Sequence, residues 1–198
     1  MIIGVDPSIA STGISDGVIH EIIAIPPTDD WEGGFNRVND QIDAIRDFVD
    51  SHGADIGEIT IYVEGPLLRA AHAKTENGST KIIAHLFDMG IWFCAFMNYA
   101  SQQSWNVVTV SPSTLKKFVC GKGQAQKQQV LLQAYKKWNI EIGQDPGLDK
   151  LHAYCLVKYG EAVERGDITH EPYTRCGKSK GVSATTNGTD RSSKAEIR

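Results

Sequence analysis

A chain of 198 residues, 41% of them hydrophobic, can bury one sizeable core, and we therefore expect a single domain. Its four cysteines are widely spaced without a CxxC pair, so the sequence indicates neither a zinc knuckle nor a disulfide scaffold and favours a reducing compartment. The formal net charge of -4 argues against a uniformly basic nucleic-acid-binding protein. The charge is unevenly distributed, however, because acids predominate between Glu21 and Glu64 whereas the stretch from Ser111 to Ile140 has none.

The first part of the chain predicts short strands followed by an amphipathic helix. Apolar runs between turn residues predict strands at Ile2–Asp6, Gly13–Ser15 and Val18–Ile25, with Ser15-Asp16-Gly17 as a hairpin turn. Apolar residues then recur at helical spacing from Phe35 to Val49. A fourth strand is predicted at Ile59–Glu64.

The second part of the chain predicts mainly helices. The segment from about Lys81 to Ala100 is apolar nearly all round, which indicates a helix buried in the core or against a second subunit. His85 and Asp88 make it too polar to span a bilayer, so we expect a soluble protein with no membrane partner. After it we predict a strand at Asn106–Val110, a short helix from Ser111-Pro112 broken by Gly121 and Gly123, a helix at Gln124–Trp138, and a helix beginning near Asp145-Pro146. The polar residues 174–198 are expected to form a disordered tail.

These elements predict an α/β domain with a mixed sheet of about five strands, covered by helices on both faces. In open sheets of this kind, ligands bind at the ends of the strands. Two acids stand at such ends, because Asp6 follows the first apolar run and Glu64 follows the fourth. The last helix adds Asp149 and His152, which lie one turn apart on the same face.

Together these four side chains predict a site for divalent cations, since a metal relieves the repulsion between neighbouring carboxylates. Each residue also has a purely structural explanation. Asp6 could stabilise the turn that follows it, and Glu64 could be a solvated strand end. Asp149 could interact with the helix dipole, and His152 could be a structural histidine.

The acid-free stretch carries Lys116, Lys117, Lys122, Lys127, Lys136 and Lys137. A solvated helix face normally has acids interspersed with its lysines. We therefore expect this stretch to form a basic face that binds the phosphates of a nucleic acid.

Four ordered blocks of sequence carry a resemblance to a known family: "IIGVDPSIASTGIS", "IYVEGPLL", "VSPSTLKKFVCGKGQAQKQQV" and "LDKLHAYCL". The third is the most specific, because its Ser-Pro, Leu-Lys, Gly-x-Gly-x-Ala-x-Lys and Val positions all match in register. From Met1 to Tyr159 the chain resembles the RuvC-type Holliday junction resolvases of the ribonuclease H-like superfamily. The resemblance implies a ribonuclease H-like nuclease domain over residues 1–165 and a metal-dependent endonuclease that cuts four-way DNA by paired symmetric nicks, in DNA recombination and repair.

The resemblance also implies roles for particular residues. Asp6, Glu64 and Asp149 would bind Mg²⁺, for which Mn²⁺ would substitute, and His152 stands where the family usually has a fourth acid. Two cations held there would activate a water molecule and clamp the scissile phosphate. The predicted DNA contacts are Lys116, Lys127, Lys122, Leu67 and Arg69. Leu67 stands where resolvases often carry an aromatic wedge, and it could equally pack under the sheet.

The family resemblance further implies a homodimer, formed through the apolar helix, in the cytoplasm of a bacterial cell or a phage-infected host. Two sites related by a two-fold axis match the near two-fold symmetry of a four-way junction. A broader nuclease acting on flaps or forks remains an alternative, as does a non-catalytic DNA-binding module. An actin-like or sugar-kinase-like nucleotide-binding protein shares the Asp-Ser-Thr-Gly pattern of the first hairpin, but the chain lacks a second phosphate loop, and we expect no nucleotide cofactor.

Overall fold

The computed structural model describes residues 1–8, 10–26, 31–53, 58–65, 79–143, 145 and 147–170. The predicted tail at 174–198 and the predicted DNA contacts Leu67 and Arg69 lie outside the described residues.

Five strands form one mixed sheet, as the sequence predicts: β1 (Ile2–Asp6), β2 (Ser11–Ser15), β3 (His20–Ala24), β4 (Thr60–Glu64) and β5 (Asn106–Val110). Their order is β3-β2-β1-β4-β5. The strands β1, β2 and β3 are antiparallel neighbours, whereas β4 runs parallel to both β1 and β5. The two parallel pairs bring the carboxyl ends of β1, β4 and β5 to one edge of the sheet.

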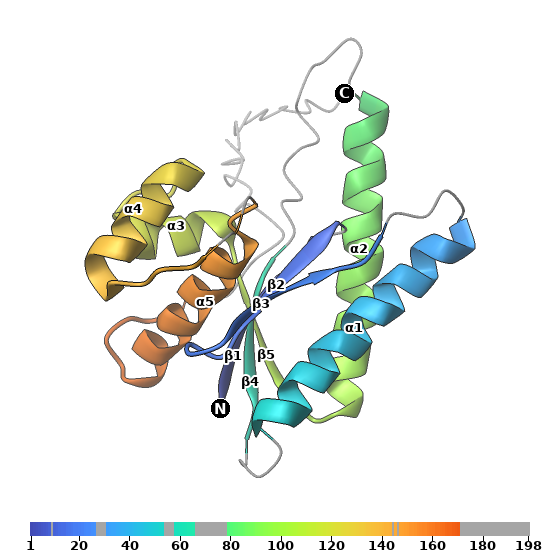
Figure 1. The fold of residues 1–198 in the computed structure, drawn as a ribbon, viewed down its shortest axis with the longest axis horizontal. Helices are drawn as coiled ribbons and strands as arrows, with labels where there is room; N and C mark the ends of the chain where they lie inside the picture. The colour runs from blue at the N-terminus through green and yellow to red at the C-terminus, as the bar shows by residue number, and fades with distance from the viewer. Residues whose placement is uncertain are drawn as a thin grey trace, which may run out of the picture.

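Helices cover both faces of this sheet (Figure 1). On one face lie α1 (Trp31–Gly53) and α2 (Ser79–Gln102), and on the other lie α3 (Pro112–Cys120), α4 (Lys127–Trp138) and α5 (Asp149–Glu164). Because successive side chains of a strand point to opposite faces, Ile3, Val5, Ile61 and Val63 pack in a core with α1 and α2, whereas Tyr62 packs with α3, α4 and α5. The predicted α/β fold with a mixed sheet and helices on both faces is confirmed.

Capping groups explain where α3 begins and ends. The Ser111 hydroxyl accepts a hydrogen bond from the Thr114 N–H at 3.0 Å, and Pro112 occupies the first turn. The helix ends at Gly121, whose φ of 76° lies in the left-handed region that glycine adopts without strain. The predicted start at Ser111-Pro112 and the predicted break at Gly121 are both confirmed.

Two helix starts differ from the prediction. The helix α4 begins at Lys127 rather than Gln124, because Gln126 and Gln129 form a reciprocal capping box there. The helix α5 begins at Asp149 rather than near Asp145-Pro146. Asp145 nevertheless caps it from a distance, since its two carboxylate oxygens accept the N–H groups of Asp149 and Leu151, each at 3.0 Å.

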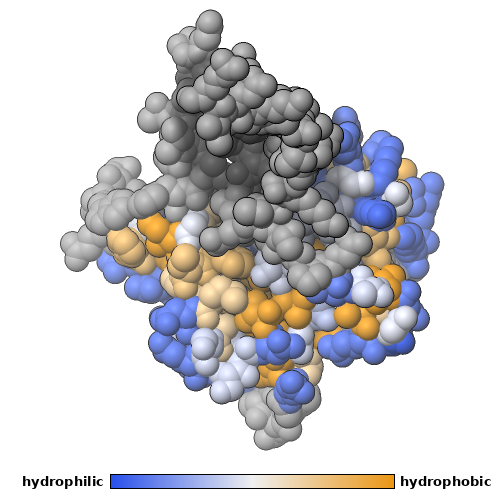
Figure 2. Space-filling model, turned by 180° about the vertical axis from the view of Figure 1, so that it is seen from behind, coloured by the Kyte–Doolittle hydropathy of each residue, from blue (hydrophilic) through white to orange (hydrophobic). Residues whose placement is uncertain are grey.

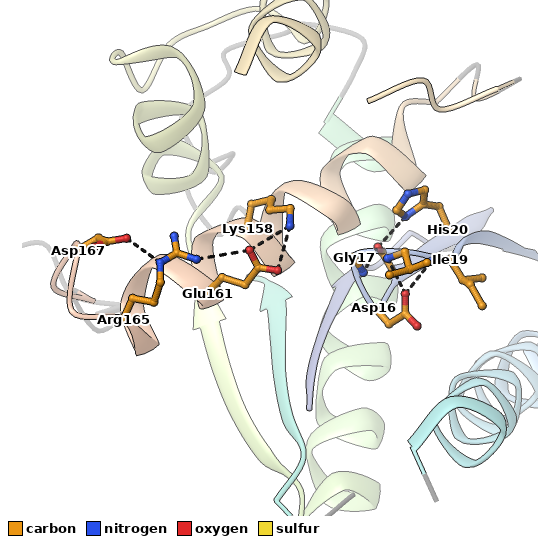
Figure 3. Close-up of polar contacts among 10 residues, drawn as sticks. Asp16, Gly17, Ile19, His20, Lys158, Glu161, Arg165 and Asp167 are labelled. Carbon is orange, nitrogen blue, oxygen red and sulfur yellow. Dashed lines mark hydrogen bonds and ion pairs between the residues drawn. The ribbon is translucent and has the colours of Figure 1, made fainter. Parts of the chain in front are cut away.

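Polar contacts also define the β2–β3 turn and the outer side of α5 (Figure 3). The carboxylate of Asp16 accepts the N–H groups of Val18 at 2.8 Å and Ile19 at 2.7 Å, so β3 starts at His20 instead of the predicted Val18. Further along α5, an ion-pair chain runs from Lys158 through Glu161 and Arg165 to Asp167. These are exposed or partly exposed pairs, which contribute little to stability.

Some apolar side chains remain at the surface. On the face opposite to that of Figure 1, they form a band beside hydrophilic margins (Figure 2). Exposed large apolar side chains include Met97 on α2 and Leu131, Leu132 and Tyr135 on α4. Within the described part of the chain, every helix falls short of the length and apolarity that crossing a membrane requires.

Candidate metal centre

Asp6 and Glu64 end two neighbouring parallel strands at the centre of the sheet. Val5 of β1 is in register with Val63 of β4, and the two acids are the next residues of the two strands. Both side chains therefore lie at the same edge and point to the α5 face. Asp6 is only 9% exposed, and the Glu64 side chain is 18% exposed.

Two glycines allow α5 to approach this edge closely. A Cβ atom on Gly4 would lie 1.9 Å from the carbonyl oxygen of Ala153, and one on Gly13 would lie 2.1 Å from that of Asp149. Gly13 is the registered partner of Asp6 across the β1–β2 pair. Since any larger residue would collide with the α5 backbone, these glycines set the distance between the helix and the acid. Nothing in the local sequence singles out these two glycines, because close packing between a strand and a distant helix leaves no local pattern.

The close packing of α5 brings His152 against both acids. Its Nδ1 atom lies 3.2 Å from Asp6 Oδ2 and 4.0 Å from Glu64 Oε2. Each of the three residues offers a ligand atom, and these atoms all lie within 4.8 Å of one another. We call Asp6, Glu64 and His152 the acid–histidine group.

Burial and mutual repulsion make the two carboxylates costly to ionise. Desolvation raises the pKa of Asp6, although hydrogen bonding to His152 opposes the shift. Burial, followed by repulsion from Asp6, raises the pKa of Glu64 to about 8. Burial alone would lower the pKa of His152, but its hydrogen bond to Asp6 and the two negative charges outweigh that effect and raise it. A divalent cation between these groups would remove the repulsion.

One atom of this group is left without a partner. The Nε2 atom of His152 is buried and has no hydrogen-bond partner in the structure. A buried ring nitrogen in this condition is costly unless water or a ligand satisfies it. The fit to a divalent cation such as Mg²⁺ or Mn²⁺ rests on the donor set itself, which is two carboxylates and the imidazole that faces them.

Asp149 lies beside this group rather than within it. It is the first residue of α5, and its Oδ2 atom accepts a hydrogen bond of 2.5 Å from the Ser11 hydroxyl of β2. Its negative charge adds to the effect of burial in raising the pKa of Asp6, so Asp149 lies close enough to act electrostatically on that carboxylate. Sequence reasoning missed Ser11, because it predicted the second strand to begin at Gly13, whereas β2 begins at Ser11.

The predicted lysine contacts separate into two sets. Lys127 donates to the carbonyl oxygen of Gly147 at 2.8 Å, two residues before Asp149. The positive charges of Lys116 and Lys127 both act on Glu64, where they partly counter burial and the repulsion from Asp6. Lys122 is exposed, and its charge acts on Cys120, as does that of Lys116.

Comparison with known proteins gives a structural match without a sequence match. No family model matches the chain, and no curated protein matches its sequence. The structure of Thermus thermophilus RuvC superposes with a TM-score of 0.60 at 15% identity, covering 87% of this chain and 99% of that one. The chain has a RuvC-like fold.

A second solved structure gives the same match. It is that of T. thermophilus RuvC in complex with a Holliday junction substrate, with a TM-score of 0.57, 13% identity, and coverage of 87% of this chain and 98% of that one. At identities this low, the two matches show a shared fold and nothing further. In this chain, Asp6 and Glu64 stand at the carboxyl ends of β1 and β4, where open α/β sheets bind their ligands.

Proposed function

We propose that this chain is a divalent-metal-dependent, structure-specific DNA endonuclease that resolves four-way junctions by paired nicks. The observation that carries this proposal is the buried acid–histidine group, two of whose members are carboxylates forced together at the strand ends. We assign the activity to residues 1–165, which include every residue of the proposed site. The RuvC-like fold supports the same reaction class.

Asp6, Glu64 and His152 would hold the metal, and Asp149, which is hydrogen-bonded to Ser11 beside them, would complete the ligand set. When bound, Mg²⁺ or Mn²⁺ supplies Lewis-acid activation of a water molecule and of the scissile phosphate. A proton on His152 Nδ1 and a cation compete for the same Asp6 carboxylate, since the two atoms are only 3.2 Å apart. Metal affinity is therefore expected to rise with pH.

The lysines supply the charge that DNA binding requires. Lys116 and Lys127 act electrostatically on the acids, so a phosphate that approaches the site meets cations and not carboxylates alone. The positive charge continues along α3 and α4, because the sequence between Ser111 and Ile140 contains lysines but no Asp or Glu. Lys122 lies on the same stretch and would bind phosphates further from the cleaved bond.

Paired nicks require two copies of the site, and we propose that α2 forms the interface of a homodimer. Supporting this assignment, the apolar side chains of Cys94 and Met97 are exposed on α2, which is a largely apolar helix. A two-fold axis would then present two acid–histidine groups to strands of like polarity. Equilibrium sedimentation of the full chain, with Met97→Glu as the perturbed variant, tests this interface.

The deciding experiment is cleavage of a labelled synthetic four-way junction beside a flap and a plain duplex, each in Mg²⁺ and in Mn²⁺. Asp6→Asn removes the central carboxylate, and Asp40→Asn, an exposed acid of α1, is the matched control. Symmetric nicks in the junction that disappear only with Asp6→Asn support the proposal. Preference for the flap would assign a broader branch nuclease, and binding without cleavage in either metal would assign a DNA-binding module.

A further inference from the structure

A buried polar chain connects α2, α1 and the backbone that follows Asp6. The indole Nε1 of Trp92 donates to Gln41 Oε1 at 2.7 Å, and Gln41 Nε2 donates to the carbonyl oxygen of Ser8 at 3.1 Å. Trp92 is fully buried, and Gln41 is 1% exposed. Ser8 lies two residues beyond Asp6 along the chain.

The directions of these two hydrogen bonds explain why the side chain of residue 41 is an amide. An indole N–H can only donate and a backbone carbonyl can only accept, so the bridging side chain needs an acceptor at one atom and a donor at another. Glutamine supplies both at the right length, whereas an apolar residue supplies neither and an ionised glutamate only accepts. Hydrogen bonds of this kind add little net stability, because folding exchanges them for hydrogen bonds to water, and a well-packed apolar side chain would stabilise the core to a similar extent. The amide therefore selects a geometry more than it adds stability.

That geometry concerns the backbone beside the acid–histidine group. From the β2 side, Thr12 also contacts Ser8, since its hydroxyl lies 3.3 Å from the Ser8 carbonyl oxygen and 3.5 Å from the Ser8 nitrogen. Thr12 is fully buried too. Ser8 is thus held by a helix on one side and a strand on the other, directly after the strand that ends in Asp6.

We propose that Gln41, anchored by Trp92, is a positioning residue that fixes the turn after β1 and thereby keeps the Asp6 carboxylate in place for metal binding. This inference rests on the proposed function, because it assumes that Asp6 binds a metal. It makes the metal affinity of the site depend on a helix pair, α1 and α2, on the opposite face of the sheet. Groups hydrogen-bonded directly to a metal ligand typically change metal affinity by about 10- to 100-fold when they are removed, and Gln41 acts one step further away, through the Ser8 backbone.

The test measures Mn²⁺ binding to the full chain without DNA, by electron paramagnetic resonance of the free ion. Gln41→Met approximately keeps the side-chain volume and removes the hydrogen bonds to Trp92 and Ser8. Thr12→Val loosens Ser8 from the other side with an isosteric change, and serves if Gln41→Met does not fold. Ile45→Val, in the same helix and fully buried, is the control for a general loss of core packing. Thermal unfolding of each metal-free variant is recorded in parallel.

We expect Gln41→Met to weaken Mn²⁺ binding by about 10-fold, the lower end of that range, and Thr12→Val by a smaller factor in the same direction. Ile45→Val should lower the melting temperature and leave Mn²⁺ affinity within about twofold. Unchanged affinity in Gln41→Met, or an equal loss in Ile45→Val, would overturn the positioning role and leave the proposed function standing. A wild-type chain that binds no Mn²⁺ would overturn both.

Discussion

Replacing Gly4 by alanine tests whether the approach of α5 to the sheet builds the site. The new Cβ would lie 1.9 Å from the carbonyl oxygen of Ala153, whereas ordinary contact begins near 3.4 Å. The α5 backbone would therefore have to retreat by about 1.5 Å. His152 directly precedes Ala153, so its Nδ1 atom would move beyond hydrogen-bond distance of Asp6, from which it now lies 3.2 Å.

Overpacking of this kind costs about 1–3 kcal/mol, which corresponds to a decrease of roughly 2–12 °C in melting temperature for a chain of this size. A misplacement of about 1 Å in a catalytic group can cost about 100-fold in rate, and we expect a loss of that order in junction cleavage. The assays are thermal unfolding of the metal-free protein and single-turnover cleavage with Mg²⁺.

Gly34→Ala is the matched control, because a Cβ on Gly34 of α1 would meet no atom within 4 Å. It should stabilise the helix by about 0.5–1 kcal/mol and leave cleavage unchanged. If Gly4→Ala melted and cleaved like the wild type, the reasoning that glycine sets the helix-to-sheet distance would be wrong.

Three further predictions follow from charges and caps. Burial and then repulsion from Asp6 raise the pKa of Glu64 from 4.5 to about 8. The folded carboxyl keeps a proton that the unfolded one loses, so metal-free stability should fall as the pH rises through this range. Melting curves of Glu64→Gln should show a weaker pH dependence, and an undiminished slope would contradict the assignment. Lys127→Ala and Lys122→Ala should each reduce the salt slope of junction binding by about 1. Only Lys127→Ala should also slow cleavage of the bound junction in single-turnover assays. Equal slowing by both variants would refute the assignment of Lys127 alone to the cleavage site. Asp145→Ala removes two hydrogen bonds to the start of α5 and should lower the free energy of unfolding, measured in urea, by about 0.5–2 kcal/mol. An unchanged urea midpoint would exclude a capping role for Asp145.

Local patterns predicted the elements of this fold well where a strand or helix has clear end signals. The strands Ile2–Asp6 and Asn106–Val110 match β1 and β5 at both ends, and the start of α3 follows from Ser111-Pro112. The start of α5 was misplaced, because Asp145 caps the helix across a loop and not from the adjacent position. A cap that acts across an intervening turn has no fixed spacing in sequence.

The sequence by itself determined that Asp6 and Glu64 end buried strands and that His152 follows Asp149 by one turn of a helix. Apolar runs and helical periodicity are local properties, and a charge that ends such a run can be located without knowing what lies opposite. Only the tertiary structure decided that His152 faces both acids, whereas Asp149 accepts a hydrogen bond from Ser11. That choice depends on how closely α5 packs over Gly4 and Gly13. These contacts join residues far apart in the chain, and their distances follow from packing, which no local pattern encodes.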